Sequence, residues 1–143
     1  MSLVRLINSL DTIQQATLNK NALVKIKASS FNKAVASILY NNGLISSWAI
    51  EHNNKEFLAN ITINLKYRNG NCVLRKIKPV SLPSRKIYAS IDDLKSIAAA
   101  RKVGLVKGSV LGQVTILETV YGIVELDTAL EKGVGGKVLA YAF

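Results

Sequence analysis

The sequence predicts an α+β fold in which an N-terminal α/β layer of helix, strand, helix and three strands packs with a smaller, β-rich domain. Helical and alternating apolar patterns follow one another in the first half, and β-branched runs dominate the second half. Pro79 and Pro83 bracket the one proline-marked stretch of the chain. We therefore expect an N-terminal α+β domain at 1–78 and a C-terminal β-rich domain at 79–143.

The first half begins with a helix whose apolar side chains share one face: Leu3, Leu6, Ile7 and Leu10. Residues 22–28 then alternate between apolar and basic side chains, which predicts a strand with a basic face. Ser29 or Ser30 can cap a second helix, and Gly43 can end it. This part of the chain is therefore predicted to form a helix, a strand and a second helix.

Three strands are expected next. The stretch "LISSWAI" at 44–50 predicts a short strand, and apolar residues alternate with polar ones over 57–67. Asn69 and Gly70 tolerate positive φ and predict a tight hairpin turn into a strand at 72–78.

The second half opens with "RKIYA" at 85–89, which predicts a strand. Ser90 and Asp93 have the spacing of a capping box, so we expect a helix through Ala98 that ends before Gly104. The β-branched run at 113–120 then predicts a core strand.

The chain ends with a short helix, a glycine-rich turn and a final strand. Gly133 lies where a C-cap glycine belongs after a helix at 127–132. Gly135 and Gly136 exceed what a C-cap requires, which leaves room for close approach to a ligand backbone or sugar. A phosphate-binding P-loop does not fit the same stretch, since Val138 replaces the required Ser or Thr and a strand follows.

The charge balance favours polyanionic partners. Nineteen Lys and Arg against nine Asp and Glu give a net charge of +10, which suits nucleic acid or an anionic membrane surface. No apolar run approaches the length of a spanning helix, so no membrane partner is expected. Cys72 is the only cysteine, which rules out an internal disulfide and fits a reducing compartment.

Catalytic chemistry has little support in the sequence. His52 and Cys72 are single residues of their types, so a metal site lacks its usual ligands. We expect Cys72 to be a small core residue and His52 a solvated loop residue. The chain is therefore predicted to be no enzyme, with no catalytic residue, metal, cofactor or small-molecule substrate. An enzyme of unrecognised class would need a site around His52 or Cys72.

The segment "VSLPSRKIYAS" at 80–90 carries a pattern suited to RNA. Ser81 and Ser84 offer hydroxyls, and the neighbouring Arg85 and Lys86 offer positive charge. Tyr88 follows Lys86 by two positions, so it shares its strand face and can stack on a sugar or base. A polar loop that leads into an ordinary strand is the alternative interpretation.

Four stretches together resemble the S-eight family of small-subunit ribosomal proteins: "MSLVRLIN", "SSFNKAVASILYNNGLI", "LKYRNGNCVLRKIKPVSLPSRKIY" and "GVGGKVLAYAF". Their order covers nearly the whole chain, apart from residues 98–112. The resemblance implies a structural protein that binds a ribosomal RNA stem in the central domain of the small subunit. It also implies neighbouring ribosomal proteins as partners, and a C-terminal domain at 79–143 that makes most of the RNA contact.

The RNA-binding residues expected from this resemblance and from the local pattern are Arg5, Asn8, Ser29, Ser81, Ser84, Arg85, Lys86, Tyr88, Thr119, Gly122, Gly135, Gly136 and Lys137. One departure from the family lies at 118–122, where "ETVYG" stands in place of Ser-Thr-Ser-x-Gly. Thr119 and Gly122 match, whereas Glu118 and Val120 replace serines. Hydroxyl contact with RNA is therefore not expected at those two positions.

The start and the divergent middle of the chain are most similar to a mitochondrial member of fungal type. The expected location is the mitochondrial matrix, in the mitoribosome, and the cytoplasm of a bacterium or another organelle is the alternative. The first helix is compatible with an uncleaved import signal. A free-standing RNA-binding or regulatory protein with the same fold is the second functional hypothesis, because of the altered 118–122 loop.

Overall fold

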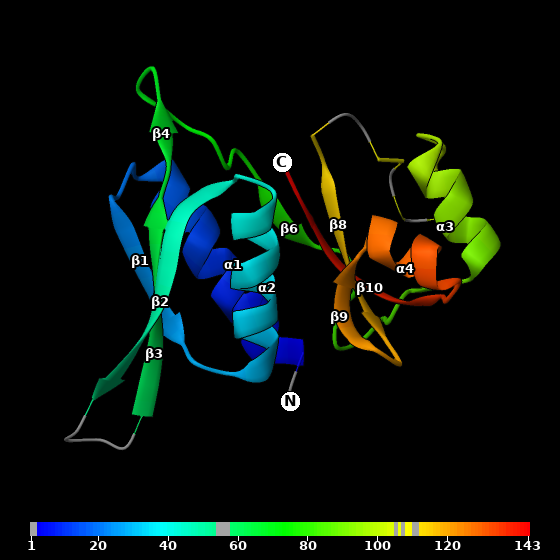
Figure 1. The fold of residues 1–143 in the computed structure, drawn as a ribbon, viewed down its shortest axis with the longest axis horizontal. Coiled ribbons are helices and arrows are strands. Elements are labelled where there is room, and N and C mark those ends of the chain that lie inside the picture. Colours follow the sequence, from blue (N-terminus) through cyan, green and yellow to red (C-terminus); the bar gives the residue numbers. More distant parts are fainter. Residues whose placement is uncertain (1–2, 54–57, 105, 107, 110–111) are drawn as a thin grey trace. The chain divides into compact units, whose positions relative to one another are not determined.

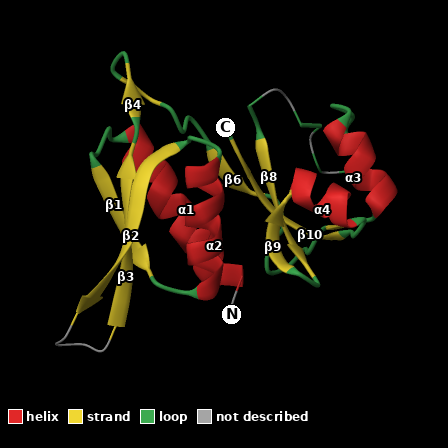
Figure 2. Ribbon diagram, in the orientation of Figure 1, coloured by secondary structure: helices red, strands yellow, loops and turns green. Residues whose placement is uncertain are grey.

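The computed structural model describes residues 3–53, 58–104, 106, 108–109 and 112–143. Helices and antiparallel strands alternate along the chain, so the predicted α+β class is confirmed (Figures 1 and 2). Two compact units are present, one of Met1–Ile77 with Phe143 and the other of Lys78–Ala142.

In the first unit two helices cover one face of a three-stranded sheet whose order is β1-β3-β2 (Figure 1). The elements are α1 (Leu3–Leu18), β1 (Leu23–Lys27), α2 (Ser30–Asn41), β2 (Ile45–Asn53) and β3 (Leu58–Leu65). Strand β1 alternates strictly between exposed and buried residues, as its sequence pattern predicts. Ile61 and Ile63 of β3 are fully buried, and Phe57, the expected start of this strand, lies outside the described residues.

A small hairpin follows, formed by β4 (Tyr67–Arg68) and β5 (Asn71–Cys72). Asn69 and Gly70 have φ of 53° and 80°, so the predicted turn with positive φ at both central positions is confirmed. Cys72 is half-buried on this hairpin, so the expectation of a core cysteine is wrong.

The single strand expected at 72–78 is wrong as well, because extended pairing stops at Cys72 and resumes only in β6 (Ile77–Pro79). Between them the N–H groups of Arg75 and Lys76 both donate to the carbonyl of Phe143, at 2.7 and 2.9 Å. The Gln14 side-chain oxygen accepts from the Ile77 N–H at 2.8 Å. These partners lie far away in sequence and redirect the backbone.

The second unit contains a sheet of order β6-β10-β8-β9, with β7 paired to β10. Its other strands are β7 (Tyr88–Ala89), β8 (Val114–Thr119), β9 (Gly122–Glu125) and β10 (Gly136–Ala142). The strand expected at 85–89 is thus shorter than predicted. Strand β9 was not foreseen, since four residues carry too little pattern for detection.

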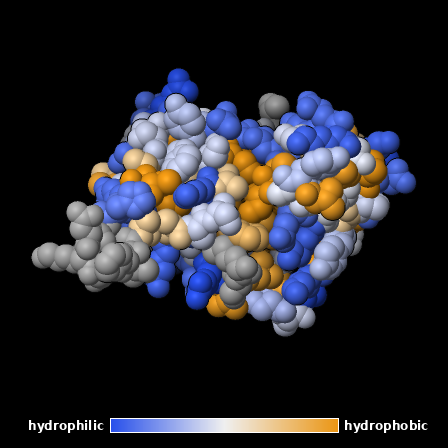
Figure 3. Space-filling view, turned by 60° about the horizontal axis from the view of Figure 1, so that its bottom comes forward, coloured by the Kyte–Doolittle hydropathy of each residue, from blue (hydrophilic) through white to orange (hydrophobic). Residues whose placement is uncertain are grey.

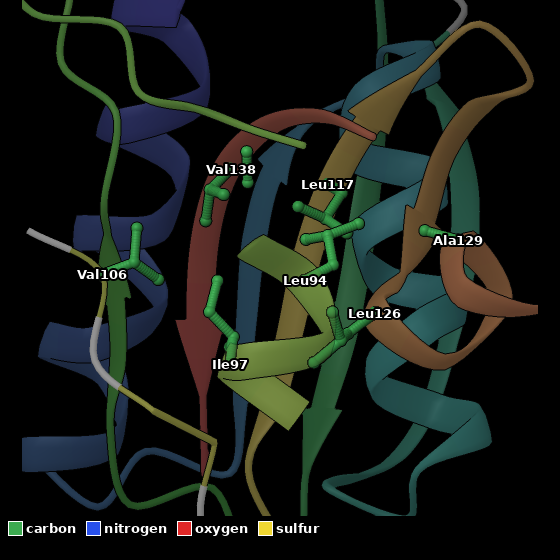
Figure 4. Close-up of a cluster of buried hydrophobic side chains, with 8 residues drawn as sticks. Leu94, Ile97, Val106, Leu117, Leu126, Ala129 and Val138 are labelled. Atoms are coloured by element: carbon green, nitrogen blue, oxygen red, sulfur yellow. The ribbon is translucent and has the colours of Figure 1, made fainter. Parts of the chain in front are cut away.

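Helices α3 (Ile91–Ala98) and α4 (Leu126–Lys132) complete this unit. The capping box of Ser90 and Asp93 and the left-handed C-cap at Gly133 are both confirmed. Figure 4 shows side chains from the two helices and from β8 and β10 converging on one cluster. Leu94, Ile97 and Leu117 are fully buried in it, so this unit has its own core.

Hydrophilic residues are interspersed with apolar ones on the face of the molecule drawn in Figure 3. Within the described residues, no helix is long and apolar enough to cross a membrane. The 98–112 segment contains an isolated bridge between Val103 and Val106, and part of it lies outside the described residues.

Candidate nucleic-acid interface

A tight turn at Leu82–Arg85 presents the basic residues that the sequence singled out. The Leu82 N–H donates to the Arg85 carbonyl at 2.8 Å, and the Arg85 N–H returns a bond of 3.0 Å to Leu82. Pro83 has the fixed φ that favours the second position of such a turn. Ser84, Arg85 and Lys86 are all exposed.

Neither Arg85 nor Lys86 forms an ion pair with a carboxylate among the described residues. Tyr88 follows on β7 and is 68% exposed. The structure therefore brings a hydroxyl, two basic side chains and an aromatic ring together on one short, accessible segment.

Ser81 differs sharply from Ser84, because it is fully buried. Its hydroxyl oxygen accepts from the Ile87 N–H at 3.0 Å, and the hydroxyl donates to the Val138 carbonyl. It thereby joins both ends of the 81–88 segment to β10. Its hydroxyl does not face solvent and holds the segment in place in this geometry, and a role of Ser81 in RNA binding stays a prediction.

Gly135 and Gly136 lie against the backbone of their own unit. A Cβ at Gly135 would lie 2.5 Å from the Ala89 carbonyl oxygen, and one at Gly136 would lie 2.3 Å from that of Glu118. Both distances are far below contact distance, so only glycine fits at either position. The close approach that the sequence suggested is therefore made by neighbouring strands.

Lys137 and Glu118 are direct cross-strand partners on β10 and β8. The Lys137 Nζ lies 2.9 Å from the Glu118 Oε2, and the two side chains are 18% and 34% exposed. On its other side Lys137 pairs in register with Tyr88. A partly buried carboxylate therefore neutralises the lysine that was expected to meet RNA.

The β8–β9 turn carries the residues that depart from the family pattern. Thr119 accepts the Tyr121 N–H and donates to the Gly122 carbonyl, both at 3.1 Å. Gly122 has a φ of +99°, which a side chain would strain. Val120 is 87% exposed, so it is no part of the core.

Tyr121 was not among the predicted site residues, yet it is 60% exposed on this turn. The Lys132 Nζ of α4 lies 4.6 Å from the centre of its ring. An aromatic residue between a β-branched run and a glycine was the available sequence signal. This signal identifies Tyr121 only when the residue is known to lie in a turn between two strands.

The three candidates of the first unit lie on its two helices. Arg5 and Asn8 are exposed and three residues apart on α1, so they share a helical face. Ser29 is the N-cap of α2, and its side chain accepts the Asn32 N–H at 3.1 Å. Among the residues that the structure describes, its hydroxyl proton has no acceptor.

Catalytic geometry is not formed by the residues considered from sequence. Burial raises the pKa of the Cys72 thiol, which opposes thiolate formation. His52 is exposed on β2, where a loop was expected. No group of three His, Cys, Asp or Glu within the described residues is placed to hold a metal ion.

The model of the family described as Ribosomal protein S8 matches residues 5–143. The chain belongs to the ribosomal protein S8 family. A Small ribosomal subunit protein uS8m from Neurospora crassa is 31% identical, over 97% of this chain and 98% of its own length. The uS8 protein of Lactobacillus johnsonii is 33% identical, over 94% of this chain and 92% of its own length.

A third relative, uS8m from Schizosaccharomyces pombe, is 40% identical over 54% of this chain and 51% of its own length. The predicted S8 family is thus confirmed, and with it the prediction that the chain is not an enzyme, since this is a family of ribosomal proteins. Mitochondrial and bacterial relatives are similar to comparable degrees, so identity alone does not select the mitochondrial type.

Proposed function

We propose that the chain is a structural constituent of the small ribosomal subunit that binds a ribosomal RNA stem in the central domain. Membership of the S8 family and the net charge of +10 support this function. The observation that carries it is the 82–88 segment, with its exposed hydroxyl, its two basic side chains without an ion pair in the described part of the chain, and its exposed tyrosine ring.

This segment has the chemistry that RNA requires. An A-form helix hides its base edges in a deep, narrow groove, so proteins bind its phosphates, 2′-hydroxyls and unstacked bases. In the proposal Arg85 and Lys86 bind phosphates, Ser84 bonds to sugar or phosphate, and Tyr88 stacks on a sugar or base. Ser81 fixes the segment from beneath through its bonds to Ile87 and Val138.

The C-terminal domain at 79–143 supplies the main RNA surface in this proposal. Within it Lys137 contributes less than Arg85 or Lys86, because its charge is already matched by Glu118 at 2.9 Å. Thr119 and Gly122 fix the neighbouring turn, while Gly135 and Gly136 let the strands approach. The N-terminal domain at 1–78 adds a second contact through Arg5, Asn8 and Ser29.

The proposed compartment is the mitochondrial matrix of a fungus. The near-complete coverage of the Neurospora crassa uS8m protein, 98% of its length, supports this. The cytoplasm of a bacterium is the other candidate, because the Lactobacillus johnsonii protein is equally similar.

The function is tested by sedimentation of the tagged protein from its source cells, with sequencing of the RNA crosslinked to it. Most copies should co-sediment with small subunits, and the crosslinks should fall on one stem of the small-subunit RNA. Recovery mainly at the top of the gradient, crosslinked to other RNAs, would instead establish a free-standing RNA-binding protein. Fractionation of the same cells identifies the compartment.

A further inference from the structure

Strand β2 forms one edge of the sheet in the first unit. It spans nine residues, Ile45–Asn53, and pairs only with β3. The edge strands β1, β6 and β9 are shorter, with five, three and four residues. Over the ranges that the structure describes, no backbone hydrogen bond joins β2 to an element other than β3. Because alternate residues of an antiparallel strand turn their N–H and C=O groups away from the partner strand, β2 has a row of such groups along its outer side.

The sequence of β2 lacks the residues that normally prevent further pairing at an edge. Proteins use short edge strands, lysines and prolines for this purpose. Strand β1 carries Lys25 and Lys27, and β6 ends at Pro79. Strand β2 contains no Lys, Arg or Pro, and its one register shift lies at its start, between Ile45 and Ser47. The rest of the strand can therefore accept another strand.

Two apolar side chains of β2 are incompletely covered. Trp48 and Ile50 are the register partners of Ile63 and Ile61, so they lie on the sheet face that the helices cover. Ile61 and Ile63 are fully buried, whereas Trp48 is half-buried and Ile50 is 36% exposed. An added strand with apolar side chains on this face would continue the row and cover both β2 residues.

The charge around β2 differs from that of the rest of the chain. Only one of the nineteen Lys and Arg residues, Lys55, lies between 34 and 65, together with Glu51 and Glu56. RNA-binding surfaces depend on cations that neutralise phosphates. Glu51 is exposed on β2, and its Oε2 lies 3.3 Å from the Lys25 Nζ of β1. This edge therefore suits a protein with a basic side chain better than it suits RNA.

We propose that the outer edge of β2 pairs with an extended segment of another small-subunit protein, which adds a strand to the β1-β3-β2 sheet. The inference rests on the proposed function, because the partner belongs to the same particle. Main-chain hydrogen bonds hold such a segment, and its side chains alternate between the two faces of the sheet. Its apolar side chains contact Trp48 and Ile50, and a basic side chain on the opposite face pairs with Glu51.

A second copy of this chain fits the edge less well. Pairing β2 with the β2 of another copy would bring no Lys or Arg opposite Glu51, since the strand contains neither. Two chains that each carry a charge of +10 also repel each other. A basic segment of a different protein supplies the missing cation.

The test measures amide hydrogen exchange of the full-length protein, free and within purified small subunits, residue by residue by mass spectrometry. In the free protein, exchange along 47–52 should alternate between slow and fast, because β3 protects every second amide. In the subunit the alternation should disappear, since the other amides should exchange at least about ten-fold more slowly. A photo-crosslinking residue at Ser47, which is exposed, should join one extended segment of another ribosomal protein.

Two lysine variants distinguish this edge from the opposite one. Ala49→Lys adds a lysine to β2 that repels a basic partner, so the crosslink yield should fall about ten-fold. Leu23→Lys is the matched control, because Leu23 is 46% exposed on β1 and gains the same charge at the other edge. It should leave the crosslink unchanged, and thermal melts should show that both variants fold.

Alternating exchange that persists in small subunits would overturn the strand site and leave the proposed function intact. Crosslinks to ribosomal RNA alone, or to a second copy of the chain, would overturn it too. An equal fall of the crosslink in both folded lysine variants would mean that β2 is not the edge used. A tagged protein that is absent from small subunits would overturn both the strand site and the proposed function.

Discussion

The start of β10 lies beside the end of β8, where Gly136 approaches Glu118, and the β8–β9 turn follows directly, yet the two regions have different surroundings. At Gly135 and Gly136 the missing side chains make room for the protein's own carbonyls. At Val120 and Tyr121 the side chains face solvent. Residue type alone therefore does not tell a contact surface from its supporting framework. The same contrast separates buried Ser81 from exposed Ser84.

The largest effect is expected at Gly136. In Gly136→Ala the new Cβ would lie 2.3 Å from the Glu118 carbonyl oxygen, so the free energy of unfolding should fall by about 3 kcal/mol or more. Gly133→Ala is the matched control, because its Cβ meets nothing within 4 Å and only the φ of +66° is strained. It should cost about 1 to 2 kcal/mol.

Urea unfolding of both variants measures the difference. Similar small losses in both would mean that the strands do not approach as described. Because Gly136 contacts its own unit, we expect Gly136→Ala to lose RNA binding only to the extent that it loses folding.

A second test compares the two serines. Ser81→Ala leaves the part-buried Ile87 N–H and the buried Val138 carbonyl without the Ser81 hydroxyl, so the free energy of unfolding should fall by about 1 to 3 kcal/mol. Ser84→Ala should change stability by less than about 0.5 kcal/mol and act on RNA affinity alone. Thermal melts and RNA titrations of the same two variants check this, and a stable Ser81→Ala protein would contradict the framework role.

The β8–β9 turn should be improvable for RNA binding. Glu118→Ser with Val120→Ser removes a carboxylate, frees Lys137 and restores two hydroxyls, so binding of the cognate stem should tighten roughly ten-fold at fixed salt. Because Val120 is exposed, the serine there should not destabilise the fold. RNA titration of the single and double variants measures the gain.

Glu51→Gln is the control, since Glu51 pairs with Lys25 at 3.3 Å on the first unit, and its side chain is 52% exposed. Its effect on affinity should stay below about two-fold because exposed charges are screened by salt. Weaker binding by folded Glu118→Ser protein would mean that this turn does not face RNA.

Local signals in the sequence predicted the helices well. Ser29, the capping box of Ser90 and Asp93, and Gly133 are helix-end signals that depend on residues within four positions. The alternation of apolar and polar residues also predicted β1 and β3, because helices cover only one face of that sheet. The resemblance to the S8 family rested on several such stretches in a fixed order.

The features that the sequence did not reveal depend on distant partners. The break at 73–76 follows from bonds to Phe143, and the burial of Ser81 follows from Val138. The Lys137–Glu118 pair exists only in the register of β10 and β8. Register between strands far apart in sequence is set by tertiary packing, which no local pattern encodes.

The salt dependence of RNA binding measures whether the exposed 82–88 segment binds RNA phosphates. Arg85→Gln with Lys86→Gln should make the slope of log K against log salt shallower by about one to two units. Arg101→Gln with Lys102→Gln, an adjacent basic pair exposed in the same unit, is the control and should leave the slope nearly unchanged. An unchanged slope in the first variant, or an equal change in both, would mean that this segment does not bind RNA phosphates.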